Sequence, residues 1–246
     1  MGKKILSILG LGIVLIGIVF GGNLVLILVG AILLGLGQVS KENGSNSKNK
    51  QVFHEFFDDV NIDPVSHLLD VSDTNIPLPK HDYCSGSGYV QGKYKGLDVE
   101  FCTIKLSDVT EVLRDETGLW EKNENQIYEG QWMFCKLDHE FSTWLTIYSK
   151  DRMDKFMGVE TLKTGDEAFD KKFNLSCGDQ EEALKILDSS CLEKIITLTN
   201  GPFRKFAFNL NMDGKLYIAA HSGHGFESAS RDELKWFKDW IDVLKL

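Results

Sequence analysis

The sequence predicts an α+β protein: an N-terminal transmembrane helical hairpin, followed by a soluble domain with a bent antiparallel sheet and two or three packed helices. Three observations lead to this prediction. Residues 5–39 contain no charged side chain. From about residue 88 onward, runs rich in β-branched and aromatic residues alternate between apolar and polar positions. Residues 180–198 and 231–246 instead place apolar side chains at helical spacing.

The apolar N-terminal segment is divided by the tripeptide Gly21-Gly22-Asn23. A single straight helix over residues 5–39 would be about 52 Å long, against a hydrocarbon core of about 30 Å. Two helices of about 16 residues each reach roughly 24 Å, and slight thinning of the bilayer closes the difference. Gly and Asn tolerate the positive φ angles of a reversing turn. We therefore predict a helical hairpin over residues 1–39 that contacts the lipid bilayer through residues 5–39.

The positive charges around this hairpin predict its orientation. Lys3 and Lys4 precede the first helix, Lys41, Lys48 and Lys50 follow the second, and the turn carries none. The positive-inside rule then places both ends, and the soluble domain, in the cytoplasm. The alternative is a cleaved signal peptide. It is disfavoured because the apolar stretch is too long and no small-x-small cleavage site follows a short apolar core.

The composition bounds what the rest of the chain does. The 246 residues leave room for the membrane segment and one domain of roughly 150–200 residues. Lys3 and Lys4 are the only charged residues before Lys41, so 25 basic and 36 acidic residues follow, a net charge of −11. An acidic surface disfavours nucleic acid as a partner, because such binding requires basic side chains that displace phosphate counterions. We expect a polar linker over residues 40–51 and a soluble domain over residues 52–246.

The five cysteines are widely spaced, and no Cys-x-x-Cys pair occurs. This pattern argues against a disulfide framework and against a thiolate zinc site. A reducing compartment is the simpler interpretation, in agreement with the predicted cytoplasmic orientation.

The strands are predicted from alternation and turn chemistry. Before the strands, residues 52–69 place apolar side chains on one helical face, which predicts a helix. Strands are then expected over residues 97–106, 126–137 and 143–148. Residues 206–210 and 216–220 flank Asp213-Gly214, and an Asp-Gly pair between two alternating runs predicts a β-hairpin.

Two helices are predicted from their caps. Residues 180–198 follow Asp179, which forms a capping box with Glu182, and they end at Asn200-Gly201-Pro202. Residues 231–246 follow Ser230, which forms a second capping box with Glu233. The last helix has an apolar face that includes Trp236 and Trp240. We expect this face to pack on the sheet; the alternative is a docking surface for a partner or for the bilayer interface.

No segment matches a catalytic signature, so the catalytic residues are unknown and we expect no cofactor. The weak candidates for a metal site are His221, His224 and Glu227, because two imidazoles and a carboxylate at three-residue spacing are metal-ligand types. Glycines nearby make a polar turn the preferred interpretation. The glycine-rich segment 86–92 departs from the dinucleotide-binding spacing and is expected to be a surface loop. His81 and Cys84 form a further pair of base and nucleophile types, which we interpret as incidental.

The order of several segments resembles a bacterial membrane-protein family known as domain of unknown function 3137. The segments are an aromatic-Gly-aromatic strand at 126–134, the stretch 164–187 and the hairpin end 216–219 followed by Phe226 and Glu227. The resemblance covers roughly residues 90–228 and the membrane hairpin, and is most specific at 169–187. It implies two N-terminal spans in a bacterial inner membrane and one soluble domain, with no assigned activity. The segment also has a physical account: Phe169 and Phe173 enter the core, and Asp179 caps a helix whose buried face includes Ala183 and Leu187.

The sequence thus favours a membrane-anchored protein of unknown biochemical activity that presents an interaction or scaffold domain on the cytoplasmic face. A non-enzymatic role is preferred, with an unknown protein partner. One alternative is a membrane-bound enzyme with a site near His221, His224 and Glu227. Another is an accessory subunit of a transporter or envelope complex, in which glycines such as Gly30 and Gly35 allow the membrane hairpin to pack closely.

Overall fold

The computed structural model describes residues 51–62, 69, 71, 74–113, 120–150 and 161–244. The chain divides into two compact units, Met1–Gln51 and Val52–Leu246. The predicted membrane hairpin at 1–39 lies outside the described residues, as does the linker up to residue 50. Within the part of the chain that is described, no helix is both long and apolar enough to cross a bilayer.

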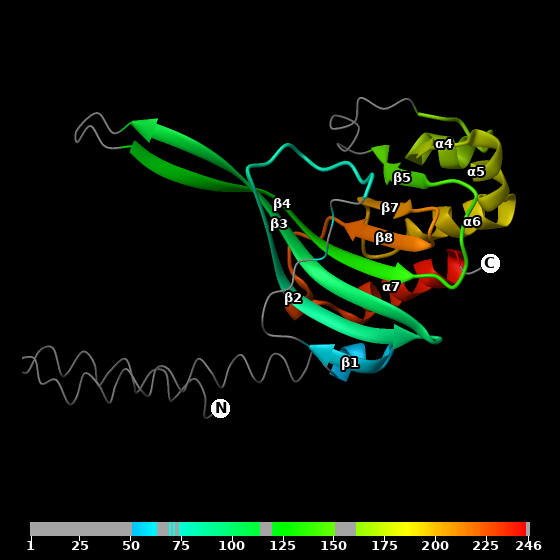
Figure 1. Cartoon of the computed structure of the whole chain (residues 1–246), viewed down its shortest axis with the longest axis horizontal. Helices are drawn as coiled ribbons and strands as arrows, with labels where there is room; N and C mark the ends of the chain where they lie inside the picture. Colours follow the sequence, from blue (N-terminus) through cyan, green and yellow to red (C-terminus); the bar gives the residue numbers. More distant parts are fainter. Residues whose placement is uncertain are drawn as a thin grey trace, which may run out of the picture. The chain divides into compact units, whose positions relative to one another are not determined.

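The second unit is built on one eight-stranded sheet, counted over the described residues (Figure 1). All pairings in it are antiparallel, and the strand order is β1-β2-β3-β4-β8-β7-β5-β6. The strands are β1 (Asp58–Ile62), β2 (Tyr83–Tyr94), β3 (Leu97–Leu113), β4 (Trp120–Lys136), β5 (Leu145–Ser149), β6 (Phe173–Cys177), β7 (Phe206–Leu210) and β8 (Lys215–Ala220). The predicted α+β class with a large antiparallel sheet is confirmed.

The turn residues account for the two tightest hairpins. Gly214, between β7 and β8, has a φ of 82°, so the predicted Asp-Gly turn is confirmed. A methyl group at this position would also lie 2.3 Å from the carbonyl oxygen of His139. Between β2 and β3, Lys95 and Gly96 have φ angles of 51° and 83°. Two consecutive positive φ angles make the two-residue turn whose twist matches the flanking strands.

Two sequence-based predictions about the first half of this unit are wrong. Among the described residues of the predicted helical face 52–69, only Val52 and Phe53 are helical, and β1 begins at Asp58. The glycine-rich segment 86–92 lies inside strand β2 instead of in a surface loop. Gly88 has a φ of 64° and forms a bulge between Ser87 and Val90 in the pairing of β2 with β3. A glycine in the left-handed region lets a strand carry an extra residue, so the strand continues past it.

Four helices and one short 3-10 helix accompany the sheet in the described residues. They are α4 (Glu167–Lys172), α5 (Gln180–Ile186), α6 (Ser189–Leu198), η2 (Phe226–Ser228) and α7 (Arg231–Leu244). The single helix expected over residues 180–198 is divided in two. Asp179 caps α5 as predicted, but Asp188 caps α6 by accepting a hydrogen bond of 2.7 Å from the Cys191 N–H. A second capping residue inside an apolar run starts a new helix in a new direction.

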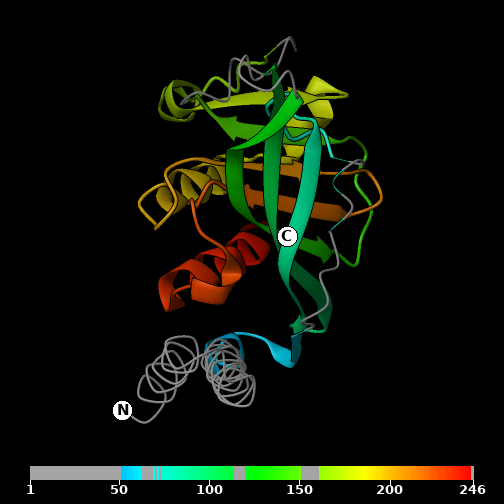
Figure 2. The same ribbon diagram turned by 90° about the vertical axis from the view of Figure 1, so that its left-hand side faces the viewer.

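The main core lies between the helices and one face of the sheet (Figure 2). The apolar face of α7 is buried in it: Trp236 is 3% exposed and Trp240 is 0% exposed. The packing interpretation of this helix is therefore confirmed, and the docking alternative is wrong for this face. Phe169 and Phe173 are buried as well, as are Ala183 and Leu187.

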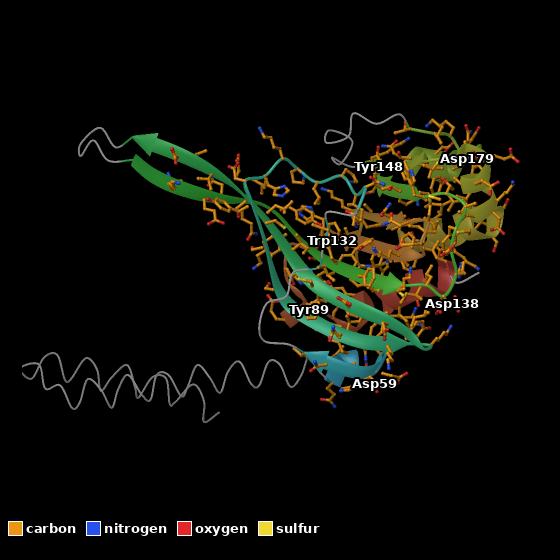
Figure 3. The ribbon with its side chains drawn as sticks, viewed as in Figure 1. Asp59, Tyr89, Trp132, Asp138, Tyr148 and Asp179 are labelled. Carbon is orange, nitrogen blue, oxygen red and sulfur yellow. The ribbon has the colours of Figure 1, made fainter. Side chains whose placement is uncertain are left out.

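The opposite face of the sheet carries a second cluster of buried side chains. Leu69 and Ile76, from the connection between β1 and β2, pack there against apolar residues of the sheet. Tyr89, Trp132 and Tyr148 contribute to the same cluster from β2, β4 and β5 (Figure 3). The central strands are buried on both faces, and for this reason their sequences are nearly continuous runs of apolar residues.

Asp242 of α7 ties the last helix to the β2–β3 turn. Its carboxylate accepts hydrogen bonds of 2.8 Å from the Tyr94 hydroxyl and 2.7 Å from the Lys95 ammonium group. Burial acts to raise the pKa of Asp242, but the hydrogen bonds from Lys95 and Tyr94 outweigh it and hold the pKa below its usual value of 3.8. The folded state therefore favours the charged carboxylate.

We expect the substitution Asp242→Asn to lower the free energy of unfolding by about 1 kcal/mol at pH 7. Because the pKa is depressed in the folded state, this stabilisation is complete above pH 3.8 and is lost as the pH falls through the folded-state pKa. The difference between the two proteins should therefore shrink in acid. Urea unfolding followed by tryptophan fluorescence at pH 7 and pH 3 measures it, with the exposed Asp98→Asn as the control. An equal difference at both pH values would contradict the assignment.

Candidate functional site

The three predicted candidates lie in the connection between β8 and α7, but they point to different neighbours. His221 directly follows β8, and its ring meets the ring of Tyr128 edge-on, with 5.2 Å between the centroids. Burial lowers the pKa of His221, and the charge of Lys205 lowers it further. The neutral form is thus favoured, which suits an aromatic contact better than a charged site.

His224 lies between a strand and a helix. Its Nε2 is 3.1 Å from Oε1 of Glu233 on α7, and its Nδ1 is 3.2 Å from Nε2 of Gln131 on β4. With the proton on Nε2, the imidazole donates to Glu233 and accepts from the Gln131 amide. Gln131 is 0% exposed, and its Oε1 has no hydrogen-bond partner among the described residues. The imidazole thus fastens the loop to the sheet below it and to the helix that follows.

Glu227 lies on η2 and folds back over two glycines. Methyl groups built on Gly225 and Gly88 would lie 2.2 Å and 3.5 Å from its Oε2. Next to it, the Phe226 N–H donates a hydrogen bond of 3.0 Å to the hydroxyl of Thr103 on β3. This contact seats the short helix on the sheet, close to the bulge at Gly88.

These positions do not combine the three candidates into a metal site. Among the described residues, no group of three or more His, Cys, Asp or Glu side chains is close enough to hold a metal ion. His221 meets an aromatic ring, while His224 is bonded to Gln131 and Glu233. The sequence did not identify Gln131 and Glu233 as the hydrogen-bond partners of His224. The 93 residues between Gln131 and His224 leave no local pattern that pairs them.

Ser228, His224 and Glu233 form a row that has the residue types of a hydrolytic triad. The Ser228 hydroxyl is 3.3 Å from Nδ1 of His224, whose Nε2 faces Glu233. The remaining bonds favour a structural role. The Ser228 hydroxyl also donates to the Gly225 carbonyl at 3.2 Å, and Oε2 of Glu233 accepts from the Ser230 N–H at 2.7 Å. The predicted capping box of Ser230 and Glu233 is thus present, and His224 bonds to its free oxygen.

We expect the substitution Glu233→Ala to lower the free energy of unfolding by roughly 1–2 kcal/mol. It removes a capping interaction at the start of α7 and leaves a partly buried imidazole without its acceptor. Urea unfolding measures the change. Glu227→Ala is the matched control, because Glu227 is an exposed glutamate of the same connection, and its change should stay within about 0.5 kcal/mol. Equal losses in both variants would contradict the fastening role of Glu233.

The pair of His81 and Cys84 shows no activation. The His81 Nδ1 is 2.9 Å from the carbonyl oxygen of Pro79. Cys84 is partly buried, and burial raises the pKa of its thiol. A reactive cysteine needs the opposite shift.

A second feature of the sheet was not predicted: the outer halves of β3 and β4 leave it as a two-stranded arm (Figure 1). We define the β-arm as residues 108–113 and 120–126. Pairing of β2 with β3 ends at Ser107, and pairing of β4 with β8 begins only at Gln131. The two strands of the β-arm therefore pair only with each other in the described part of the chain. Its exposed side chains are Asp108, Thr110, Glu111, Lys122, Asn123, Glu124, Asn125 and Gln126.

The base of the β-arm has a defined structure. Ile127 is the extra residue of a bulge in β4, opposite Leu106 and Ser107, and it is 40% exposed. On the β2 side, the Asp82 carboxylate accepts a hydrogen bond of 2.8 Å from the Val109 N–H. This bond lowers the pKa of Asp82 below its usual value. A bulge increases the twist of a strand pair, which directs the β-arm away from the sheet.

The family comparison concerns the part of the sheet and the helices that follow the β-arm in the chain. Residues 126–243 match a family model described as "Protein of unknown function (DUF3137)". This region of the chain is similar to the DUF3137 family. The matched region begins at the base of the β-arm, and it includes the connection that holds His221, His224 and Glu227. The resemblance inferred from the sequence is thereby confirmed.

No curated protein matches this chain. Among solved structures, the crystal structure of the mycobacterial trehalose monomycolate transport factor A, TtfA, is similar. It is 10% identical, with a TM-score of 0.44, and the alignment covers 82% of this chain and 96% of that chain. Similarity at this level supports no inference about function.

Proposed function

We propose that this protein is a membrane-anchored, non-enzymatic docking protein that holds a partner protein at the cytoplasmic face of the membrane. The single observation that carries the proposal is the β-arm. It extends from a well-packed sheet, and among the described residues its two strands pair only with each other, while the Val109 N–H donates to the Asp82 carboxylate at its base.

The energetics of such an arm support a binding role. An isolated two-stranded hairpin is only marginally stable in water, because it buries little apolar surface. None of the β-arm side chains that the structure describes belongs to either buried cluster of the sheet. Its side chains are mostly charged or amide-bearing, which keeps exposed strands from pairing indiscriminately. A long exposed hairpin that does not stabilise the domain is best explained by contacts with another molecule.

The anchor and the orientation rest on the sequence. The uncharged residues 5–39 favour a hairpin in the bilayer, and the flanking lysines favour a cytoplasmic domain. A single-cysteine variant tests the orientation, with the cysteine placed at Ser45 and the native cysteines replaced. A membrane-impermeant thiol reagent should label it only after cell lysis. Labelling in intact cells would overturn the cytoplasmic orientation and leave the docking proposal standing.

The enzyme alternative receives less support. His221, His224 and Glu227 do not form a three-residue metal group, and both ring nitrogens of His224 are engaged in fastening the loop. A role as an accessory subunit of a transporter or envelope complex is a special case of docking. It remains a prediction for the membrane hairpin, where large residues at Gly30 and Gly35 should break assembly and leave the second unit folded.

Site-specific photo-crosslinking in cells tests the docking proposal. A photoreactive amino acid at Thr110 or Asn123, one on each strand of the β-arm, should give a discrete cross-linked protein after detergent extraction of the full chain. The matched control is Glu193, an exposed residue of α6. Absence of a cross-link from both arm positions, or the same product from Glu193, would overturn the proposal.

A further inference from the structure

We propose that the free edge of β4 in the β-arm binds an extended, basic segment of the partner protein by adding it to the sheet as a further strand. This inference rests on the proposed docking function and specifies the chemistry of the partner. Peptides that add to a sheet edge gain affinity from main-chain hydrogen bonds, and side chains at alternate positions supply specificity.

The hydrogen bonds at the base of the β-arm show in which direction the described backbone groups of its strands point. The Ser107 carbonyl accepts a hydrogen bond of 3.0 Å from the Asp82 N–H, and the Val109 N–H donates to the Asp82 carboxylate. Ser107 and Val109 therefore point their backbone groups away from β4. In an antiparallel pair, opposite residues point both sets of groups inward or both outward. Gln126 and Glu124, their partners on β4, thus face the other edge of the β-arm.

Alternation extends this edge along β4. Every second residue of a strand directs its backbone groups to the same edge, so Lys122 and Trp120 also direct their backbone N–H and C=O groups outward. The edge therefore spans residues 120–126, about 23 Å at 3.3 Å per residue. It ends at the bulge of Ile127, beyond which the Glu129 carbonyl accepts from the Gly223 N–H. The corresponding edge of β3 is shorter, because Asp82 already occupies the N–H of Val109.

The charge of the β-arm selects the occupant. Its residues 108–113 and 120–126 carry four acidic side chains and one basic side chain, a net charge of −3. A lysine- or arginine-rich segment complements this charge. A second copy of the same β-arm would place like charges opposite one another, which destabilises a strand pair. An extended basic segment of a different protein fits both the backbone and the charge.

Peptide binding to the full-length chain in a nonionic detergent tests this inference. The probe is a fluorescein-labelled, amide-capped peptide of four Lys-Thr repeats, followed by fluorescence anisotropy. We expect it to bind at least about tenfold tighter than the matching peptide of four Glu-Thr repeats. Methylation of alternate backbone nitrogens on the edge that faces β4 should reduce binding by about tenfold, because main-chain hydrogen bonds are lost.

Two variants of Glu124 separate the backbone from the charge. Glu124→Pro removes an outward N–H, and proline is tolerated at a sheet edge that faces solvent. Glu124→Gln removes only the charge. We expect roughly tenfold weaker binding for Glu124→Pro and about twofold weaker binding for Glu124→Gln. Equal affinity for the two peptides, or unchanged binding of the methylated peptide, would overturn strand addition. If photo-crosslinks from Thr110 or Asn123 persist in that case, docking stands and only its mode is wrong.

Discussion

Excision of the β-arm will abolish partner binding and leave the rest of the domain folded. Ser107 and Gln126 are paired across β3 and β4, so the dipeptide Asn-Gly can join them in place of residues 108–125. Asn-Gly favours the turn whose twist matches antiparallel strands. No described side chain of the excised segment belongs to either buried cluster, so we expect the hydrophobic stabilisation of the domain to be retained.

The measurements are partner recovery and unfolding. The amount of the cross-link partner that co-purifies with the full-length chain from detergent extracts should fall at least about tenfold, and the basic peptide should show no saturable binding. The free energy of unfolding should change by less than about 1 kcal/mol, because the described residues that are removed are exposed or partly buried and lie outside both buried clusters. Normal recovery of the partner by the excised protein would sink the docking role of the β-arm.

Truncation of Trp240 will produce the largest loss of stability. Its indole is 0% exposed, and its ring centroid lies 4.7 Å from that of Phe208 and 5.3 Å from that of Phe206. Trp240→Ala leaves a large cavity between α7 and the sheet. We expect it to lower the free energy of unfolding by about 3–5 kcal/mol, measured by urea unfolding with circular dichroism.

Trp240→Phe is the matched control. It keeps most of the apolar contact and removes a buried indole N–H that has no hydrogen-bond partner among the described residues. Removal of this unsatisfied N–H stabilises the variant and offsets part of the destabilisation from the small cavity. The free energy of unfolding should therefore fall by less than about 2 kcal/mol. A mild effect of Trp240→Ala would show that α7 packs less tightly than the aromatic contacts indicate.

The match to the DUF3137 family covers the inner part of β4 through most of α7, including the His221–Ser230 connection. The outer part of β4 and all of β3 precede it. Nearly all of the β-arm therefore lies outside the matched region, whereas His224 and Glu233 lie inside it.

Local chemistry determined the features that the sequence alone predicted. Asp179 and Ser230 start helices because a side-chain oxygen close to the first turn accepts an unpaired N–H. Gly214 ends one strand and starts the next because its φ of 82° suits glycine. The apolar spacing of the last helix likewise placed Trp236 and Trp240 in the core. Each of these predictions depends on residues within a few positions of one another.

Only the tertiary structure decided the features that depend on distant residues. The segment 86–92 was predicted to be a surface loop, but it lies in strand β2. The bulge at Gly88 is stabilised by the pairing of β2 with β3, which the composition of the segment does not reveal. His224 meets Gln131 across 93 residues, so no spacing rule links them. The β-arm arises because β2 and β8 stop short of the ends of β3 and β4. A free edge is defined by the absence of a neighbour, and the neighbours of a strand are set by the order of the whole sheet and not by the sequence of that strand.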